Sequence, residues 1–315
     1  MTGNTVVAER AGFIGLGMMG LPMARNLAGV AVEVLVHDVQ ADAVAAAVSH
    51  PRITALSGPR QIAASCGIVF TCLPSPQAVR QVHLGRNGLL AGAHDGLIVC
   101  ELSTTSPELS MEVGSALAKR GARYVETMMI GPPATARSGE LFFIVGGDEA
   151  LGQHIEPALA AMGRGWHWVG GLGGASRAKL LHNALGMIHM AATAEIMGLC
   201  MVTGIDPDAF ADIIRQSPKS EGIGYSTVFD LFSTSIAHGF PTGTGKLNIA
   251  AKDTKLARAL AERASYPTPL LDDASAMFQE AMDAGLGEHE YTRVSKVVEA
   301  RFGSTIFAEP EQKTS

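Results

Sequence analysis

The chain has 315 residues, of which 47% are hydrophobic and 17% charged, and its formal net charge is −6 at pH 7. This length predicts about two domains. No basic patch stands out, so nucleic acid is disfavoured as a partner. The first ten residues carry Glu9 and Arg10 and have no apolar core, so we expect no secretory signal and a cytoplasmic protein. So much apolar surface with so little charge indicates a subunit interface, and we expect a homodimer or homotetramer.

The most informative stretch is residues 12–27, where a Gly-x-Gly-x-x-Gly pattern lies between a strand-like run and a helix-like run. In a dinucleotide-binding fold, the first glycine makes a tight turn and the second lets the backbone approach a pyrophosphate. The third glycine lets helix and strand pack closely, and the helix N-terminus faces the phosphate charge. The sequence therefore predicts a cofactor site at Gly15, Leu16, Gly17, Met18, Met19 and Gly20.

An acidic residue supports this interpretation. Asp38 follows Gly20 by eighteen residues and comes just after an apolar run at 32–36. A carboxylate there can accept hydrogen bonds from the ribose hydroxyls of the adenosine. It would also repel a 2′-phosphate, and the neighbouring Val39 and Gln40 offer no cation to receive one. We therefore expect NAD rather than NADP.

In chain order, the first half alternates short apolar runs with helical stretches. We expect strands at 13–15, 32–36, 68–72, 97–101, 124–126, 141–145 and 166–169, and helices at 41–49, 76–83 and 107–120. Such alternation predicts an α/β fold with a doubly wound parallel sheet of the Rossmann type and helices on both faces.

The second half reads as helices alone. After the glycine-rich run at 170–174, we expect a long helix at 175–203 that ends at Gly204, and a further helix opened by Asp206 and Pro207. Two more follow, near 248–264 and 270–284. The predicted organisation is a dinucleotide-binding domain over 1–170, a helical substrate and dimerisation domain over 171–303, and a loose tail over 304–315.

Two features could mislead. The apolar stretch 179–202 has the length of a membrane span, but it contains Glu195 and several other polar residues, which favours a buried helix of a soluble protein. The four cysteines lack metal-ligand spacing, so we expect no metal site and interpret them as buried free thiols in a reducing compartment. They are Cys66, Cys72, Cys100 and Cys200.

Polar residues follow three of the expected strands, at 73–76, 101–105 and 128–139. In this fold ligands bind outside the carboxyl ends of the strands, so these hydroxyls and backbone amides can hold a nicotinamide ribose and a substrate. An alternative for 103–106 is that its hydroxyls only cap the helix that begins at Pro107.

The long helix carries the candidate acid/base. Lys179 and Asn183 are four residues apart and share a helix face, with His182 close to the same stripe. A lysine in an apolar helix whose pKa is lowered by desolvation could take a proton from a substrate alcohol while hydride leaves the carbon. His182 is the rival base, and Asn183 would orient the substrate oxygen in either case.

With these residues in view, the chain resembles the β-hydroxyacid dehydrogenases, the 3-hydroxyisobutyrate dehydrogenase-like family related to 6-phosphogluconate dehydrogenase. The resemblance spans about 12–300 in five motifs: the glycine turn, Cys-Leu-Pro-Ser at 72, Glu-Leu-Ser-Thr-Thr-Ser-Pro at 101, Gly-Gly-Leu-Gly-Gly-Ala-Ser-Arg-Ala-Lys-Leu-Leu-His-Asn at 170, and Lys-Asp at 252.

The resemblance implies roles for particular residues. Lys179 would be the catalytic acid/base, and Lys252 would reach the nicotinamide end, although Lys252 could instead only pair with a neighbouring acid. The cofactor would further be lined by Leu73, Pro74 and Thr104. Substrate contacts would come from Ser103, Ile130, Gly131 and Asn183.

One segment departs from the family pattern. Where the family has Asp-Ala-Pro-Val-Ser-Gly-Gly, this chain has Glu-Thr-Met-Met-Ile-Gly-Pro at 126–132. Ile130 replaces a serine that contacts the substrate carboxylate, and Pro132 lacks a backbone N–H. We therefore expect Met128, Met129 and Ile130 to form an apolar wall that disfavours the smallest 3-hydroxy acids. The alternative is that Ser103, Asn183 and loop amides still bind the carboxylate.

The leading hypothesis is an NAD-dependent oxidoreductase that transfers a hydride between nicotinamide and a β-hydroxy acid or related alcohol or aldehyde. One alternative is an imine reductase, against which Lys179 argues, because that group usually lacks the lysine. The other is a catalytically inactive dinucleotide-binding protein. The joint presence of Lys179, Asn183 and Lys252 argues against it.

Overall fold

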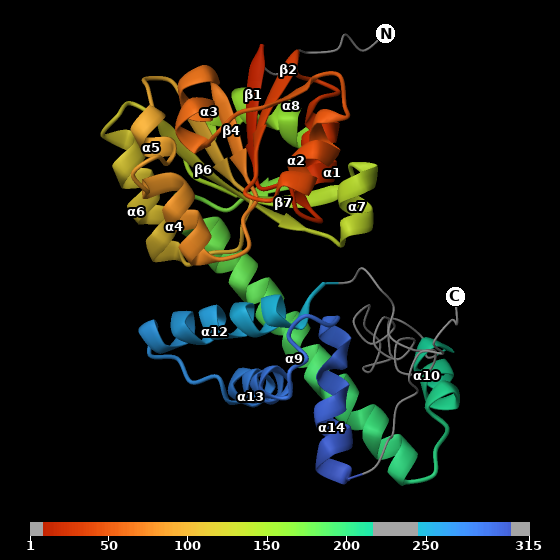
Figure 1. The fold of residues 1–315 in the computed structure, drawn as a ribbon. Helices are drawn as coiled ribbons and strands as arrows, with labels where there is room; N and C mark the ends of the chain where they lie inside the picture. Colours follow the sequence, from red (N-terminus) through yellow and green to blue (C-terminus); the bar gives the residue numbers. More distant parts are fainter. Residues whose placement is uncertain (1–8, 217–244, 304–315) are drawn as a thin grey trace. The chain divides into compact units, whose positions relative to one another are not determined.

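The computed structural model describes residues 9–216 and 245–303, so the tail predicted at 304–315 lies outside the described residues. The chain divides into two compact units, Met1–Lys179 and Leu180–Ser315. Figure 1 shows that the first is built on a sheet flanked by helices and that the described part of the second is helical.

The first unit contains an eight-stranded sheet in the order β3-β2-β1-β4-β5-β6-β7-β8. The strands are β1 (Arg10–Ile14), β2 (Glu33–His37), β3 (Ile53–Ala55), β4 (Ile68–Thr71), β5 (Ile98–Glu101), β6 (Arg123–Ile130), β7 (Leu141–Gly146) and β8 (Gly163–Trp168). The chain starts at the centre of the sheet and winds outward on both sides, which confirms the doubly wound α/β prediction.

One strand pair runs against the expected parallel order, because β7 pairs antiparallel with β6. Only residues 131–140 connect these two strands, including the short helix α7 (Pro133–Ser138). A parallel crossover needs a dozen or more residues, so this connection cannot return the chain to the other end of the sheet. Strand β3, with three residues, was not expected, and β6 extends past the predicted 124–126 as far as Ile130.

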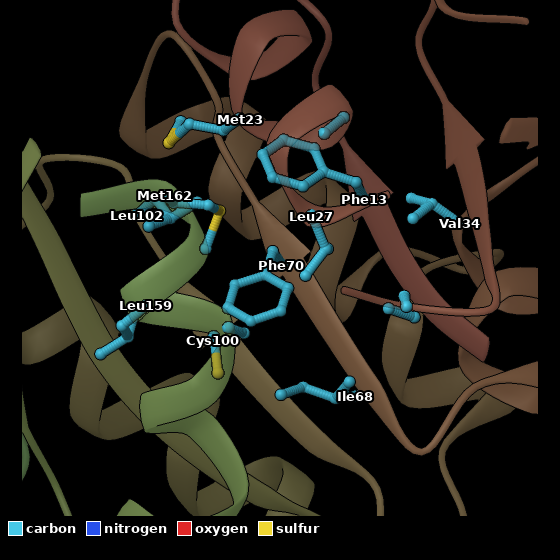
Figure 2. Packing of buried hydrophobic residues seen from close by; sticks show 14 of the residues in the cluster. Phe13, Met23, Leu27, Val34, Ile68, Phe70, Cys100, Leu102, Leu159 and Met162 are labelled. Carbon is cyan, nitrogen blue, oxygen red and sulfur yellow. The ribbon is translucent and has the colours of Figure 1, made fainter. Parts of the chain in front are cut away.

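Helices cover both faces of the sheet. One face is covered by α1 (Gly20–Leu27), α2 (Ala41–Val48), α7 and α8 (Gly152–Met162), and the other by α3 (Pro59–Ser65), α4 (Pro76–Leu84), α5 (Leu89–Gly92) and α6 (Pro107–Ala118). Successive strand residues point to opposite faces. Phe13 and Phe70 therefore meet in one apolar layer, 6.3 Å apart between ring centroids, while Ile14 and Val69 enter the other. Figure 2 shows the first layer closed by Met23 and Leu27 of α1 and by Leu159 and Met162 of α8.

Helix α9 (Gly174–Val202) is the longest element, and the chain passes into the second unit within it. Its last residue is Val202, and Gly204 terminates it as predicted: Gly204 has a φ of +80°, and the Ile205 N–H donates to the Cys200 carbonyl at 2.8 Å, closing the last turn. The remaining described helices are α10 (Pro207–Gln216), α12 (Leu247–Arg263), α13 (Pro269–Asp283) and α14 (Ser295–Phe302), with a 3₁₀ turn at Tyr291–Val294. Helix α14 was not expected from the sequence.

By length and composition, Gly174–Met201 could cross a membrane, but half of its most apolar window is buried inside the protein. Core helices of soluble proteins pass the same test, so this observation is weak evidence for a span. All four cysteines are free thiols; Cys66, Cys100 and Cys200 are buried as expected, whereas Cys72 is only half-buried.

Candidate active site

The glycine turn lies at the carboxyl end of β1 and has the geometry predicted for it. Gly15 has a φ of +94°, and a Cβ there would come within 2.1 Å of the Cys72 carbonyl oxygen. A Cβ on Gly20 would come within 1.8 Å of the Gly15 oxygen, so the turn and α1 pack too closely for any side chain. Gly17, in contrast, faces open space with no atom within 4 Å of its Cβ position. That opening is where a pyrophosphate would approach the backbone.

The other residues of the turn divide between core and surface. Leu16 is buried, Met19 packs against the core, and Met18 is 51% exposed. Leu16 therefore offers only its backbone to a ligand.

Asp38 lies beside this turn, just after β2. Its Oδ2 accepts the Leu16 N–H at 2.6 Å, and its Oδ1 accepts the Gln40 N–H at 2.8 Å. Two backbone donors therefore fix the carboxylate next to the glycine turn, where it was expected from the sequence to meet the adenosine ribose.

The turns after β4 and β5 are tied to each other. The hydroxyl of Ser103 accepts the Leu73 N–H at 2.7 Å, and the Ser103 N–H donates to Oε1 of Glu101 at 2.7 Å. Pro74 and Thr104 lie in these same two turns, exposed and half-buried respectively. The helix-capping alternative applies to Ser106, whose hydroxyl accepts the Leu109 N–H, and not to Ser103.

Beneath these turns lies a buried acid–base pair. Oε2 of Glu101 is 3.5 Å from Nε2 of His83, and both side chains are fully buried. Burial raises the pKa of the Glu101 carboxyl to about 7, against hydrogen bonds from Ser103 that favour its charged form. Burial also lowers the pKa of His83 to about 4. Desolvation thus favours the neutral form of each group.

A second buried carboxylate anchors the helix that carries Lys179. Oε2 of Glu126 accepts the N–H groups of Gly173 at 2.8 Å and Ala175 at 3.3 Å, and Oε1 accepts the Ser176 hydroxyl. A carboxylate at a helix N-terminus satisfies unpaired donors and complements the helix dipole. The half-buried Lys179 follows Ser176 by one turn, so its position is set from β6.

Ile130 and Gly131 lie at the end of β6. Ile130 pairs with Phe142 of β7 and packs against a cluster formed by Met128, Ile144 and Ala175. Gly131 has a φ of +137°, and a Cβ there would meet the Thr135 hydroxyl at 2.3 Å. The expected apolar wall is smaller than predicted, because Met128 is fully buried and cannot contact a ligand. Met129 and Ile130 remain half-buried.

In the second unit, the structure brings Asn183 and Lys252 together through Asp253, which was named from the sequence only as part of the Lys-Asp motif and was given no role. Nδ2 of Asn183 donates to Oδ2 of Asp253 at 2.6 Å, and Nζ of Lys252 lies 3.1 Å from Oδ1 of Asp253. The ion pair foreseen as the alternative for Lys252 is therefore present. His182, the rival base, is exposed, and its Nδ1 is 3.1 Å from Oδ1 of Asn183.

Comparison with known proteins fits this geometry. The profile described as the NAD binding domain of 6-phosphogluconate dehydrogenase matches residues 10–170, and one described as NAD-binding of NADP-dependent 3-hydroxyisobutyrate dehydrogenase matches 173–298. The chain is 30% identical over 297 residues to 2-(hydroxymethyl)glutarate dehydrogenase of Eubacterium barkeri, covering 94% of this chain and 97% of that protein. The chain belongs to the β-hydroxyacid dehydrogenase family.

Other members are similarly related. The mitochondrial 3-hydroxyisobutyrate dehydrogenase of Mus musculus is 31% identical, over 90% of this chain and 85% of that one. A 3-hydroxyisobutyrate dehydrogenase from Salmonella typhimurium superposes with a TM-score of 0.80 at 26% identity, covering 91% of this chain and 99% of that chain. A structure of Psf3 with NADP⁺ has the same TM-score and identity, with the same coverage. An imine reductase from Streptomyces aurantiacus, at 19% identity, a TM-score of 0.60 and 93% and 99% coverage, shares the fold alone.

For a member of this family, the carboxyl edge of the sheet is the expected ligand site, and the structure brings most predicted residues of the first unit to it. Sequence reasoning assigned no role to three partners there and in the second unit: His83, and Glu126 and Asp253, which it quoted only within motifs. A signal was available for Glu126, because a carboxylate inside an apolar strand must find buried donors. A cavity of about 470 Å³ opens at the opposite edge, near Ile68, Ile98 and Arg123, and includes none of the predicted residues.

Proposed function

We propose that this chain is an NAD-dependent oxidoreductase that transfers a hydride between nicotinamide and a β-hydroxy acid or the corresponding aldehyde. Membership of the family and its dehydrogenase relatives support the reaction class. The observation that carries the proposal is the anchoring of α9 by Glu126. Glu126 lies on β6, which ends at the carboxyl edge of the sheet, and it binds α9 one turn before Lys179.

Lys179 is the proposed acid/base. NAD, when bound, supplies the hydride acceptor. Lys179 in its neutral form takes the proton from the substrate hydroxyl, so that negative charge does not accumulate on oxygen as hydride leaves the carbon. Asp253 holds the Asn183 side chain in place. The amide of Asn183 orients the substrate oxygen by donating a hydrogen bond from its NH₂ group or by accepting one at its carbonyl oxygen. In the reverse direction Lys179 returns the proton to the new alkoxide.

Asp38 is the proposed reason for a preference for NAD over NADP. Its carboxylate is held by two backbone N–H groups and cannot swing away from a ribose. A 2′-phosphate at that ribose would meet like charge. Val39 and Gln40, which follow Asp38, carry no positive charge.

The proposed substrate is larger or more apolar than the smallest 3-hydroxy acids. Ile130 stands where the family has a serine, and it is half-buried against the apolar cluster that includes Ala175 of α9. Pro132 has no N–H to offer a carboxylate. Ser103 is not free to replace the missing serine, because its hydroxyl donates to the Glu101 carboxyl while its oxygen accepts the Leu73 N–H.

We also propose a homodimer or homotetramer in the cytoplasm. Several large apolar side chains of α9 are exposed, including Leu181 at 63% and Leu185 at 56%. Exposed apolar surface of this kind is typical of subunit interfaces. The free thiols fit a reducing compartment.

The test is a screen in which nicotinamide absorbance is followed with NAD or NADP and panels of hydroxy acids, aldehydes and imines. The proposal expects NAD-dependent oxidation of β-hydroxy acids, with efficiency rising as the carbon skeleton lengthens. Activity confined to imines would establish the alternative reductase function. Cofactor binding without turnover on any panel would establish the inactive alternative.

A further inference from the structure

The buried Glu101 side chain links the turns that follow β4 and β5 at the carboxyl edge of the sheet. Glu101 ends β5, it is fully buried, and its Oε1 accepts the Ser103 N–H. Ser103 in turn accepts the Leu73 N–H from the turn after β4. One carboxyl group thus fixes, through a chain of two hydrogen bonds, the loops predicted to line the dinucleotide.

The other oxygen of Glu101 faces His83, and the orientation of that imidazole is determined. Nδ1 of His83 is 2.8 Å from the Val79 carbonyl, which can only accept, so Nδ1 carries a hydrogen. In a neutral imidazole Nε2 is then an acceptor. Nε2 is 3.5 Å from both Oε2 of Glu101 and the Thr71 hydroxyl. Oε2 must therefore bring the hydrogen if Glu101 and His83 are to bond.

The surroundings oppose a charged carboxylate. Glu126 is the register neighbour of Glu101 on β6, and the other titratable groups that act on it, Cys72, Cys100 and Tyr124, are acids as well. A second negative charge beside Glu126 would be repelled in this buried setting. His83, on α4, is the basic group that faces Glu101.

We propose that Glu101 is a positioning residue of the dinucleotide site, and that it holds the turns after β4 and β5 as a neutral carboxyl group sharing one proton with His83. The effect on cofactor binding rests on the proposed function. The protonation of the buried pair rests on its geometry and burial and is independent of the proposed function.

The proposal has a measurable consequence for stability. In an unfolded chain with ordinary pKa values of 4.5 for Glu101 and 6.5 for His83, a single proton between those values sits on the histidine. In the folded chain the pKa of Glu101 is about 7 and that of His83 is about 4. Because the Glu101 pKa is the higher of the two, the single proton sits on Glu101. Folding moves the proton from His83 to Glu101 without binding or releasing a proton. Between pH 4.5 and 6.5 the pair therefore adds almost no pH dependence to the free energy of unfolding.

Single substitutions should expose two opposite slopes. In His83→Leu, Glu101 remains with a raised pKa, so its contribution is complete below pH 4.5 and is lost as the pH rises through about 7. In Glu101→Gln, His83 remains with a lowered pKa, so its contribution is complete above pH 6.5 and is lost as the pH falls towards about 4. Urea midpoints across this range measure both slopes.

The urea series needs the wild type, the two variants and Glu149→Gln, which removes an exposed carboxylate as a control. Relative to the wild type, we expect the urea midpoint of His83→Leu to fall as the pH rises and that of Glu101→Gln to fall as the pH falls. The midpoint of Glu149→Gln should differ from that of the wild type by the same amount at every pH. Parallel profiles for all four proteins would overturn the shared proton.

Cofactor binding tests the positioning role, with NADH fluorescence as the readout. Glu101→Gln keeps an acceptor for the Ser103 N–H and a donor towards His83, and we expect its dissociation constant to stay within about threefold of the wild type. Glu101→Met leaves the Ser103 N–H unpaired, and we expect binding about tenfold weaker. Equal binding by both variants would overturn the positioning role. If the wild type bound no NADH, the proposed function would fail, while the urea profiles would still decide the shared proton.

Discussion

The two units of the chain differ in how completely their apolar side chains are buried. In the first, strand residues enter two apolar layers that helices cover on both faces, and buried Glu101 and Glu126 each find backbone donors. In the second, Leu181, Leu185, Ile196 and Leu199 of α9 remain between 43% and 63% exposed. Among the described residues, the first unit closes its core with its own helices, whereas α9 exposes a run of large apolar side chains, and we propose that a further subunit covers them.

The difference also separates the proposed chemistry. The first unit fixes Asp38 beside the glycine turn and anchors, through Glu126, the start of the helix that carries Lys179, whereas in the second Asn183 and Lys252 gather around Asp253. Substitutions in the first unit should therefore change cofactor binding or chemistry. Substitutions on the exposed face of α9 should change assembly.

The largest effect is expected from Lys179→Ala. Loss of a placed acid/base should lower turnover by about a hundred- to ten-thousandfold, while NADH binding stays nearly unchanged. Steady-state kinetics and fluorescence titration measure the two effects. His182→Gln is the matched control and should retain most activity. The assignment of the acid/base fails if Lys179→Ala keeps more than about a tenth of wild-type turnover.

Two glycine substitutions should separate folding from binding. Gly17→Ala enters open space, so the fold should persist while NADH binding weakens by about tenfold or more, because the methyl group occupies the approach of the pyrophosphate. Gly20→Ala places its Cβ 1.8 Å from the Gly15 oxygen and should lower the thermal midpoint as well. A Gly17→Ala protein that binds NADH normally would contradict the proposed phosphate site.

These glycines illustrate what the sequence could predict. The turn, Asp38 and the end of α9 at Gly204 depend on residues near one another in the chain, so local patterns were sufficient for them. The Ser103–Leu73 bond joins residues 30 apart, Glu126 reaches Ser176 across 50, and Asn183 meets Asp253 across 70. Such contacts depend on strand order and helix packing, which no local pattern encodes.

The apolar face of α9 gives the next test. Leu181→Lys combined with Leu185→Lys places two charges on side chains that a partner subunit would cover, and we expect self-association to weaken by about a hundredfold. Val32→Lys, at a 58% exposed position of the first unit, is the control. Light scattering at micromolar concentration should report an oligomer for the wild type and the control. A wild type of 32.8 kDa in solution would contradict the proposed assembly.

A smaller effect is expected at Asp38. Asp38→Asn keeps a side chain of the same size but removes the charge that repels a 2′-phosphate. We expect the ratio of kcat/KM for NAD to that for NADP to fall by about tenfold. An unchanged ratio, or a wild type that already prefers NADP, would show that cofactor choice is made elsewhere.

An effect of similar size is expected at Ile130. Ile130→Ser restores a hydroxyl at the end of β6, and we expect kcat/KM for the shortest 3-hydroxy acid to rise by about tenfold relative to a long-chain acid. Ile130→Val, which keeps an apolar side chain, serves as the control. If the wild type already works best on the smallest acid, the proposed role of Ile130 is wrong.

Direct detection of hydride transfer tests the central claim that this chain is an NAD-dependent hydroxyacid dehydrogenase. The wild type is given NADH carrying deuterium at C4 of the nicotinamide together with aldehyde acids of increasing length, and the products are examined by mass spectrometry. The account predicts a hydroxy acid with a single deuterium on the carbon that bears the hydroxyl, and at least about a hundredfold less of it from Lys179→Ala in the same time. Deuterium found only in amines formed from imines, or in no product at all, would contradict it.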